Sequence, residues 1–370
     1  MIPFNKPYMT SKEVGYIYDA VTSGHISGNG RYTKLCQKYF EEKWGFKKTL
    51  LTTSCTDALE MCALLINIQP GDEVILPSFT FVSTALAFVR QGAVLKFADS
   101  RADHPGIDED KIEELINQKT KVIAVVHYAG VATDMDKIMA LAKKYNLLVV
   151  EDAAHAIDSY FTGKDGIKKP LGSIGHFGTF SFHETKNIQC GEGGLLAIND
   201  ERFIERAEII WEKGTTRAKF FRGEIDKYGW VDVGSSFLPS DITAAFLWAQ
   251  LDSLENIQNK RKKIWNWYNE NIEKLWSNEF EFKKPQIPAY ATNNAYMYYL
   301  VLKNTEERNK FIQTLKSKNI HSVFHYLSLH RSLYYSDKHD GRELKNSDKY
   351  ENCLVRLPLY YELDTKSVNW

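Results

Sequence analysis

The sequence predicts an α/β protein with a mostly parallel, doubly wound sheet in a large domain and a smaller C-terminal α+β domain. Three observations support this prediction. Short apolar runs alternate with helical patterns between about residues 50 and 200, which indicates βαβ units. These runs are apolar along their length, as expected of strands buried on both faces. A long helical stretch over 241–276 then precedes a shorter αβ pattern.

The alternating region contains five expected strands and four expected helices. The strands are DEVILPS (72–78), AVLKFAD (93–99), KVIAVVHY (121–128), LLVVEDAA (147–154) and GTFSFHE (178–184). The helices are TDALEMCALLINI (56–68), STALAFVRQG (83–92), DEDKIEELINQ (108–118) and DMDKIMALAKKY (134–145). Ser54 or Thr56 can cap the first helix, and the N-terminus of that helix would then suit an anion.

The long helical stretch marks the expected domain boundary. We assign residues 1–250 to a large domain that includes the N-terminal segment, and residues 251–370 to a small domain joined to it by this helix. After PQIPAY, the small domain continues with the shorter αβ pattern of AYMYYLVLKN, ERNKFIQTLKSKNI and HSVFHYLSLH.

The charge balance and the cysteines limit the function classes. Lys+Arg and Asp+Glu each number 47, so no overall basic field would attract nucleic acid or an anionic membrane. The start, MIPFNKPYMT, lacks a signal-peptide pattern, and no run reaches the roughly 18 apolar residues of a membrane span. Five cysteines without CxxC or Cys/His spacing favour free thiols and no metal site. We therefore expect a cytoplasmic protein that is neither exported nor inserted into a membrane.

One lysine stands in an unusual context. The stretch FGTFSFHETKNIQCGEGG (177–194) places Lys186 between an aromatic-rich strand and a glycine-rich turn. Strand ends in α/β folds are where ligand sites are built, because the rigid sheet aims side chains into a crevice. Most lysine side chains in proteins are exposed to solvent. A functional role for Lys186 therefore has to be supported by the residues around it.

Two further features belong with Lys186. VVEDAAHA places Asp152 at the end of an apolar strand, where a carboxylate is costly unless it meets a cation. The helix that begins near Ser54 offers an anion site at the same edge of the sheet. A lysine, a carboxylate and a phosphate-binding helix end are the three groups that pyridoxal phosphate needs.

These segments also carry a family resemblance. Four segments resemble the DegT/DnrJ/EryC1/StrS aminotransferases: SFHETKNIQCGEGG, VEDAAHA, GDEVILPSFTFVSTA and VVHYAGVATDMDKI. The resemblance runs over essentially the whole chain, from IPFNKP to RLPLYY. The resemblance implies a fold type I enzyme that uses pyridoxal 5'-phosphate, with pyridoxamine 5'-phosphate as the form between half-reactions. It also implies a homodimer with active sites at the interface.

The resemblance assigns roles to individual residues. Lys186 would bind the cofactor covalently, and Asp152 would pair with its ring nitrogen. The other implied cofactor contacts are Ser181, Thr56 and the backbone at Asp57 on the phosphate, Phe81 over the ring, and His155 against the other face or the ring hydroxyl. Many relatives carry an asparagine that reaches the neighbouring subunit's phosphate, where this chain has Ser235 and Ser236; we take Ser236 as the counterpart.

The substrate residues are expected in two segments. TTRAKFFRGEIDKYGW (215–230) mixes cations with aromatic rings, which suits a nucleotide diphosphate; Arg217 and Arg222 are the candidates there. VFHYLSLH supplies Tyr326 and His330 as candidates for the sugar. A solvated loop is the ordinary alternative for the first segment, and a structural histidine for the second.

The resemblance also suggests a substrate. FHETKN, FFRGEIDKY and GSSFL are most similar to transaminases that move an amino group from L-glutamate to C4 of dTDP-4-dehydro-6-deoxyglucose, a reaction of the enterobacterial common antigen pathway. One alternative is an aminotransferase that acts at C3 of a similar sugar. A second is a cofactor-dependent sugar dehydratase, but Lys186 argues against it because such relatives carry a histidine at that position. A third is a regulatory protein that keeps the fold without turnover. The end, TKSVNW, is expected to stop before the last helix of the relatives.

Overall fold

A seven-stranded sheet forms the centre of the computed structural model, which describes residues 1–366, 368 and 370. Its strand order is β1-β9-β8-β5-β4-β2-β3. The strands are β1 (Lys48–Thr52), β2 (Glu73–Pro77), β3 (Val94–Ala98), β4 (Thr120–Val126), β5 (Leu148–Asp152), β8 (Phe177–Ser181) and β9 (Gly194–Ile198). Neighbouring strands from β3 to β8 are parallel, and β9 is antiparallel to both β8 and β1. The mostly parallel sheet is therefore confirmed.

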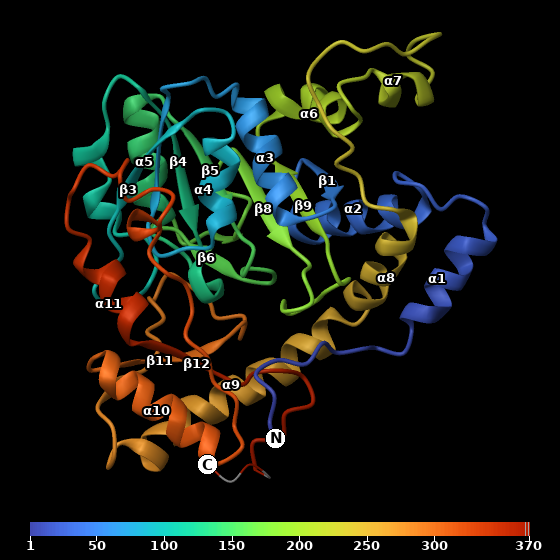
Figure 1. Cartoon of the computed structure of the whole chain (residues 1–370). Helices are drawn as coiled ribbons and strands as arrows, with labels where there is room; N and C mark the ends of the chain where they lie inside the picture. The colour runs from blue at the N-terminus through green and yellow to red at the C-terminus, as the bar shows by residue number, and fades with distance from the viewer. Residues whose placement is uncertain (367, 369) are drawn as a thin grey trace.

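Helices cover both faces of this sheet (Figure 1). One face packs against α2 (Arg31–Trp44), α5 (Met135–Tyr145) and α8 (Asp241–Leu251). The other packs against α3 (Cys55–Ile66), α4 (Val82–Val89) and α6 (Ile204–Trp211). Successive strand residues alternate between the two cores, as they must when side chains point to opposite faces. This is the doubly wound arrangement that the alternating pattern predicts.

Smaller elements complete this part of the chain. They are α1 (Glu13–Thr22), the hairpin of β6 (Tyr160–Thr162) and β7 (Lys168–Pro170), α7 (Arg217–Phe221), and the 3₁₀ turns η3 (Tyr128–Gly130) and η4 (Glu201–Phe203). In Figure 1, α7 protrudes from the body beyond α6.

The prediction of an α-helix over residues 108–118 is wrong. The chain forms two short 3₁₀ turns there, η1 (Glu109–Lys111) and η2 (Glu113–Leu115). Asp108 accepts a hydrogen bond from the Asp110 backbone, and Ile116 is already extended. Asn117 then begins a turn by bonding Thr120 Oγ1, so the segment lacks the length that an α-helix needs.

The stretch expected as one long helix over 241–276 is two helices. The first, α8, ends at Leu251, and α9 (Leu254–Trp276) begins after Asp252 and Ser253. We call the residues from α9 onward the C-terminal part. Here β10 (Phe282–Lys283), β11 (Tyr298–Leu302) and β12 (Leu354–Leu357) form an antiparallel sheet beside α10 (Thr305–Ser317), η5 (Leu329–Arg331) and α11 (Lys345–Cys353).

The C-terminal part has its own apolar core, built from α9, β11, α10 and β12. A second cluster joins Phe79 and Tyr128 of the sheet part to β11 and α11. The boundary at residue 250 stays a prediction, and it falls at the end of α8. Within the described residues, no helix is long and apolar enough to cross a membrane. The end, TKSVNW, includes Ser367 and Asn369, which lie outside the described residues.

Candidate active site

Lys186 lies in the loop after β8, where the sheet part meets the C-terminal part. Its Nζ donates a hydrogen bond of 3.2 Å to Tyr296 Oη, and Nζ lies 4.9 Å from the centre of that ring. The backbone N–H of Lys186 donates to His183 O at 2.9 Å, which fixes the turn. Among the described residues, no carboxylate forms an ion pair with the ammonium of Lys186.

Asp152 ends β5, the strand next to β8 in the sheet. Its carboxylate is buried and accepts hydrogen bonds from Thr84 Oγ1 at 2.7 Å and from the Ala154 N–H at 3.1 Å. Burial raises the pKa of this carboxyl group, although Thr84, Ala154 and the charge of Lys186 oppose the rise. No arginine or lysine in the described residues forms an ion pair with Asp152. A buried carboxylate without a bonded cation suits a protonated ring nitrogen.

His155 lies beside the pair formed by Lys186 and Tyr296. Its ring stacks on Tyr296, with centroids 4.2 Å apart and an angle of 20°. The Ala129 N–H donates to Nδ1 at 3.3 Å, so we assign the proton to Nε2, which donates to Tyr326 Oη at 3.1 Å. Burial, and then the charges of Lys186 and Arg356, hold the pKa of His155 well below its usual value. His155 is therefore a neutral ring at neutral pH.

The candidate phosphate residues gather at the N-terminus of α3. Ser54 is the cap, accepting from the Asp57 N–H at 3.1 Å, and Thr56 instead bonds Ser83 with its hydroxyl group at 2.7 Å. Ser181 pairs with Gly194 across β8 and β9, and a Cβ at Gly194 would lie only 2.3 Å from the Ser54 carbonyl carbon. The N–H of Asp57 that the resemblance gives to the phosphate is thus already bonded within this chain.

Phe81 and Ser236 are both exposed. Phe81 precedes α4, is 56% exposed, and its ring lies 6.1 Å from that of Tyr326. Ser236 lies in the segment that follows the protruding α7, and its backbone forms a bridge with Glu212, which precedes α7. Among the described residues, Ser236 has no hydrogen bond or ion pair with Lys186, Asp152 or the residues at the start of α3.

The four substrate candidates have different surroundings. Arg217 lies 3.5 Å from Glu212, and Arg222 pairs with Glu208 at 2.8 Å and Glu224 at 2.5 Å. Both arginines are therefore already paired with carboxylates near α7.

The other two candidates lie in the segment before η5 or within it. Tyr326 joins the His155 cluster and stacks on His325 at 3.5 Å. His330 is buried, with Nδ1 2.7 Å from Ser78 Oγ and Nε2 3.4 Å from Asp348. These contacts suit a structural role for His330.

Tyr296 and the residues that hold it were missed by sequence reasoning. Asn294 donates to His155 O at 2.7 Å and accepts from the Tyr296 N–H at 3.0 Å. Arg261 of α9 donates to Tyr296 O at 2.7 Å and to Ala295 O at 3.1 Å. In the sequence, Tyr296 only extends the apolar run of AYMYYLVLKN, so the pattern indicates a strand and no site residue.

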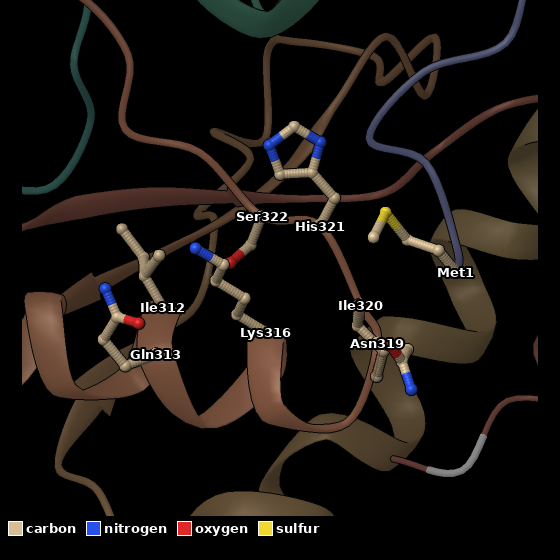
Figure 2. Close-up of a pocket in the computed structure, with 8 residues that line it drawn as sticks. All are labelled: Met1, Ile312, Gln313, Lys316, Asn319, Ile320, His321 and Ser322. Atoms are coloured by element: carbon tan, nitrogen blue, oxygen red, sulfur yellow. The ribbon is translucent and has the colours of Figure 1, made fainter.

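A separate hollow of about 320 Å³ lies on the C-terminal part (Figure 2). Ile312, Gln313 and Lys316 of α10 line one side, and Met1 with His321 lines the other. It contains none of the predicted site residues, so it does not belong to the crevice at Lys186.

The fold and the site define a pyridoxal-phosphate enzyme of fold type I. The chain belongs to the DegT/DnrJ/EryC1/StrS aminotransferase family, whose pattern it matches over residues 7–369. The sequence is 30% identical over 375 residues to the uncharacterized protein MJ1066 of Methanocaldococcus jannaschii, covering 99% of this chain and 95% of that one.

Solved structures are similar over the whole length. The aminotransferase TlmJ of Streptoalloteichus hindustanus has a TM-score of 0.88 and 26% identity, covering 100% of this chain and 96% of that one. Spr1654 of Streptococcus pneumoniae, named as a sugar aminotransferase and solved in its PLP form, has a TM-score of 0.87, 27% identity and the same coverage. A PMP form of Spr1654 is equally similar. The expected fold type, enzyme class and cofactor are thereby confirmed.

The residues at the crevice fit this cofactor. Among the described residues, the buried carboxylate of Asp152 has no bonded cation, and the side-chain nitrogen of Lys186 bonds only the phenol of Tyr296. Gly194 packs directly against the backbone at the start of α3, where a side chain would not fit. When bound, pyridoxal phosphate supplies an electron-accepting ring. Lys186 would hold the cofactor, Asp152 would keep the ring nitrogen protonated, and α3 would receive the phosphate.

Proposed function

We propose that this enzyme transfers the amino group of L-glutamate to C4 of dTDP-4-dehydro-6-deoxy-D-glucose, giving dTDP-4-amino-4,6-dideoxy-D-galactose and 2-oxoglutarate. The observation that carries the reaction class is the placement of Asp152 at the end of β5 and of Lys186 in the loop that follows β8, the neighbouring parallel strand. Similarity of FHETKN, FFRGEIDKY and GSSFL to transaminases of this sugar supports the substrate. Its place in enterobacterial common antigen synthesis is part of the same proposal.

Lys186 acts as the proton carrier in this scheme. Its Nζ takes the proton from the donor α-carbon and returns it on the cofactor side, so the amino group leaves the donor. Tyr296 Oη holds Nζ in place, and Asp152 keeps its negative charge opposite the ring nitrogen. The sugar ketone then receives the amino group at C4 by the reverse sequence, which predicts ping-pong kinetics.

We propose a homodimer whose subunits complete each other's sites. The segment around α7 supports this, because Phe221, Trp230 and Val233 are 66%, 83% and 57% exposed. Such apolar exposure is typical of a protein interface. Ser236, at the end of this segment, would then reach the neighbouring phosphate. A variant shown to be monomeric should lose cofactor affinity, and a monomer with full activity would disprove shared sites.

We also propose a cytoplasmic location. The free thiols of Cys36, Cys55, Cys62, Cys190 and Cys353 support it, since such thiols are typical of reducing compartments.

The first experiment is a two-step assay on the purified enzyme reconstituted with pyridoxal phosphate. L-glutamate is added alone, then with dTDP-4-dehydro-6-deoxyglucose, while cofactor absorbance is followed and the product is identified by mass and NMR. An axial 4-amino sugar that is absent with Lys186→Ala supports the proposal. Conversion of the cofactor without that product would shift the assignment to 3-oxo sugars. Failure of both steps would favour a regulatory role.

A further inference from the structure

The hollow on the C-terminal part combines an apolar wall with a positive charge (Figure 2). Its volume of about 320 Å³ is at the lower end of the range for small-molecule sites. Ile312 of α10 and Ile320, which follows α10, supply apolar surface, and Lys316 supplies the charge. No aspartate or glutamate of the described residues lines the hollow. Its chemistry therefore favours an anion with an apolar body.

Ser322 lines the same hollow with a hydroxyl group that has no partner. The residue is 4% exposed, and its Oγ is buried without a hydrogen bond to any described residue. In Figure 2, the hydroxyl group lies on the side of its segment that faces α10. Buried hydroxyl groups are normally hydrogen-bonded, because leaving one unpaired costs free energy. A ligand in the hollow that offers an acceptor would remove this cost.

Lys316 is in the last turn of α10, and its side chain extends toward Ser322 (Figure 2). Among the described residues, Lys316 Nζ has no ion pair, whereas Lys318 donates to Trp370 O at 2.8 Å and lies over the Trp276 ring. The dipole of α10 accounts for a cation in its last turn. It does not account for the unpartnered hydroxyl group of Ser322, so the two groups together indicate an anion.

The wall that carries Ser322 is fixed by the N-terminal segment. Ile2 forms a backbone bridge with Ile320. The Ile2 N–H donates to Asn319 O at 2.8 Å, and the His321 N–H donates to Ile2 O at 3.0 Å. Ile320 is itself part of the core of the C-terminal part. The hollow is therefore formed before any ligand binds, as is usual for small-molecule sites.

We propose that this hollow binds a small aliphatic carboxylate, with its chain against Ile312 and Ile320 and its oxygens bonded to Lys316 Nζ and Ser322 Oγ. Ammonium and hydroxyl groups both donate to a carboxylate, and the charged hydrogen bond is the stronger of the two. Burial of the chain supplies the hydrophobic contribution. The volume suits roughly ten non-hydrogen atoms, because liquid water occupies about 30 Å³ per molecule. Octanoate has this size.

The first test is an NMR titration of the full-length enzyme, loaded with pyridoxal phosphate, with octanoate. A Kd on the order of 1 mM is expected of a ligand of this size on a partly open site. Octylamine has the same chain and the opposite charge, so it should bind at least about 10-fold more weakly. Cofactor absorbance is followed in the same samples, because the crevice at Lys186 also suits anions.

Two variants locate the bound octanoate. Lys316→Gln removes the charge and should weaken octanoate binding about 3- to 10-fold. Ser322→Ala should weaken it by a similar factor without lowering the unfolding midpoint, since the deleted hydroxyl group has no partner in the free protein. Lys310→Gln is the matched control on the same helix. Lys310 lies over the Phe280 ring and does not line the hollow, so this variant should bind octanoate like the wild type.

The outcomes are independent of the proposed function, because none of these measurements requires turnover. Weaker octanoate binding in both Lys316→Gln and Ser322→Ala, with unchanged cofactor absorbance, supports the inference. Binding that is unchanged in both variants would place octanoate elsewhere and overturn it. Equal affinities for octanoate and octylamine would show that only the chain is recognised, so the carboxylate assignment would be wrong. No binding to the wild type at about 10 mM, ten times the expected Kd, would also overturn it.

Discussion

The ammonium of Lys186 and the phenol of Tyr296 are in direct contact, with Nζ 3.2 Å from Oη. The two residues are 110 positions apart and come from the loop after β8 and the approach to β11. Burial opposes ionisation of the phenol, but the charges of Lys186, Arg356 and Arg261 outweigh it and lower the pKa of Tyr296. The contact therefore restricts the position of Lys186 Nζ.

We expect Tyr296→Phe to slow the glutamate half-reaction about 10- to 100-fold, at the low end of the effect of proton-transfer groups. Without the hydroxyl, Nζ loses its bonded partner and the proton transfer is less well aligned. Cofactor loading should persist, because Asp152 and α3 are unchanged. Stopped-flow absorbance over a range of pH values measures the effect, and the dependence of the rate on pH should shift.

Tyr298→Phe is the control for this prediction. Tyr298 lies two residues further along, belongs to the other core, and has a buried hydroxyl without a partner among the described residues. Its removal should leave the half-reaction unchanged. Equal rates for wild type and Tyr296→Phe would show that the contact with Lys186 has no part in the proton transfer.

Asp152→Asn should separate activity from stability. The pKa of Asp152 is raised by burial, so its ionised form destabilises the apoenzyme at neutral pH. The neutral amide removes this cost, and we expect the free energy of unfolding of the apoenzyme to rise. Activity should fall on the order of 10³-fold, since the ring nitrogen loses its counter-charge.

Urea denaturation of the apoenzyme and the half-reaction rate test both halves of this prediction. Asp337→Asn, in an exposed ion pair with Lys338, should change neither quantity strongly. A clear loss of apoenzyme stability in Asp152→Asn would mean that the carboxylate is needed for folding. That result would contradict the inference that the carboxylate of Asp152 is positioned to pair with a cationic ring nitrogen.

The sequence predicts five strands of the sheet, β2, β3, β4, β5 and β8, but neither β1 nor β9, although β9 is apolar and buried along its length. It therefore locates Asp152 at the end of β5 and Lys186 in the loop after β8. It gives no signal for the antiparallel return of β9. The glycine turn at 191–194 returns the chain beside β8, and only the packing of Gly194 against Ser54 shows how closely the two segments approach.

The remaining site residues depend on contacts between distant segments. Tyr296 is held by Asn294 and by Arg261 of α9, and none of these residues differs locally from an ordinary strand or helix position. The same holds for Thr84, which is inside α4 and donates to Asp152. Tertiary packing, rather than local pattern, selects these partners.

Gly194→Ala should damage both the fold and the cofactor site. A Cβ there would lie 2.3 Å from the Ser54 carbonyl carbon and 2.4 Å from the Cys55 nitrogen. These are backbone atoms at the start of α3, so relief requires moving the helix end. We expect a loss of about 3 kcal/mol in the free energy of unfolding, at the upper end for overpacking. Pyridoxal-phosphate affinity should fall at least about 10-fold, a further 1.4 kcal/mol.

Gly15→Ala is the matched control for Gly194→Ala. Gly15 is inside α1, and a Cβ added there would have no atom of the described residues within 4 Å beyond its own stretch of helix. Alanine is the better helix former there, so the control should stabilise the protein by about 0.5 to 1 kcal/mol. Fluorescence titration with the cofactor and urea denaturation compare the variants. Wild-type cofactor affinity in Gly194→Ala would show that the start of α3 does not bind the phosphate.

Acid should destabilise the apoenzyme through buried neutral histidines, of which His104 is the clearest. Burial lowers the pKa of His104 to about 4, its Nδ1 accepts from the Gly106 N–H at 2.9 Å, and its Nε2 has no partner among the described residues. The unfolded chain binds a proton near pH 6.5 and the folded chain does not, so this contribution is present above pH 6.5 and is lost as pH falls toward 4. The loss amounts to about 3 kcal/mol at most.

Urea denaturation of the apoenzyme at pH 7.5, 6 and 5 measures this dependence. His104→Gln cannot gain the proton, so its stability should fall less steeply with decreasing pH than that of the wild type. His25→Gln removes an exposed imidazole and should leave the slope unchanged. His155 and His325, whose pKa values burial also holds well below the usual value, should keep part of the acid sensitivity in His104→Gln. A wild-type slope in His104→Gln would mean that the ring is already protonated or solvated in the folded protein.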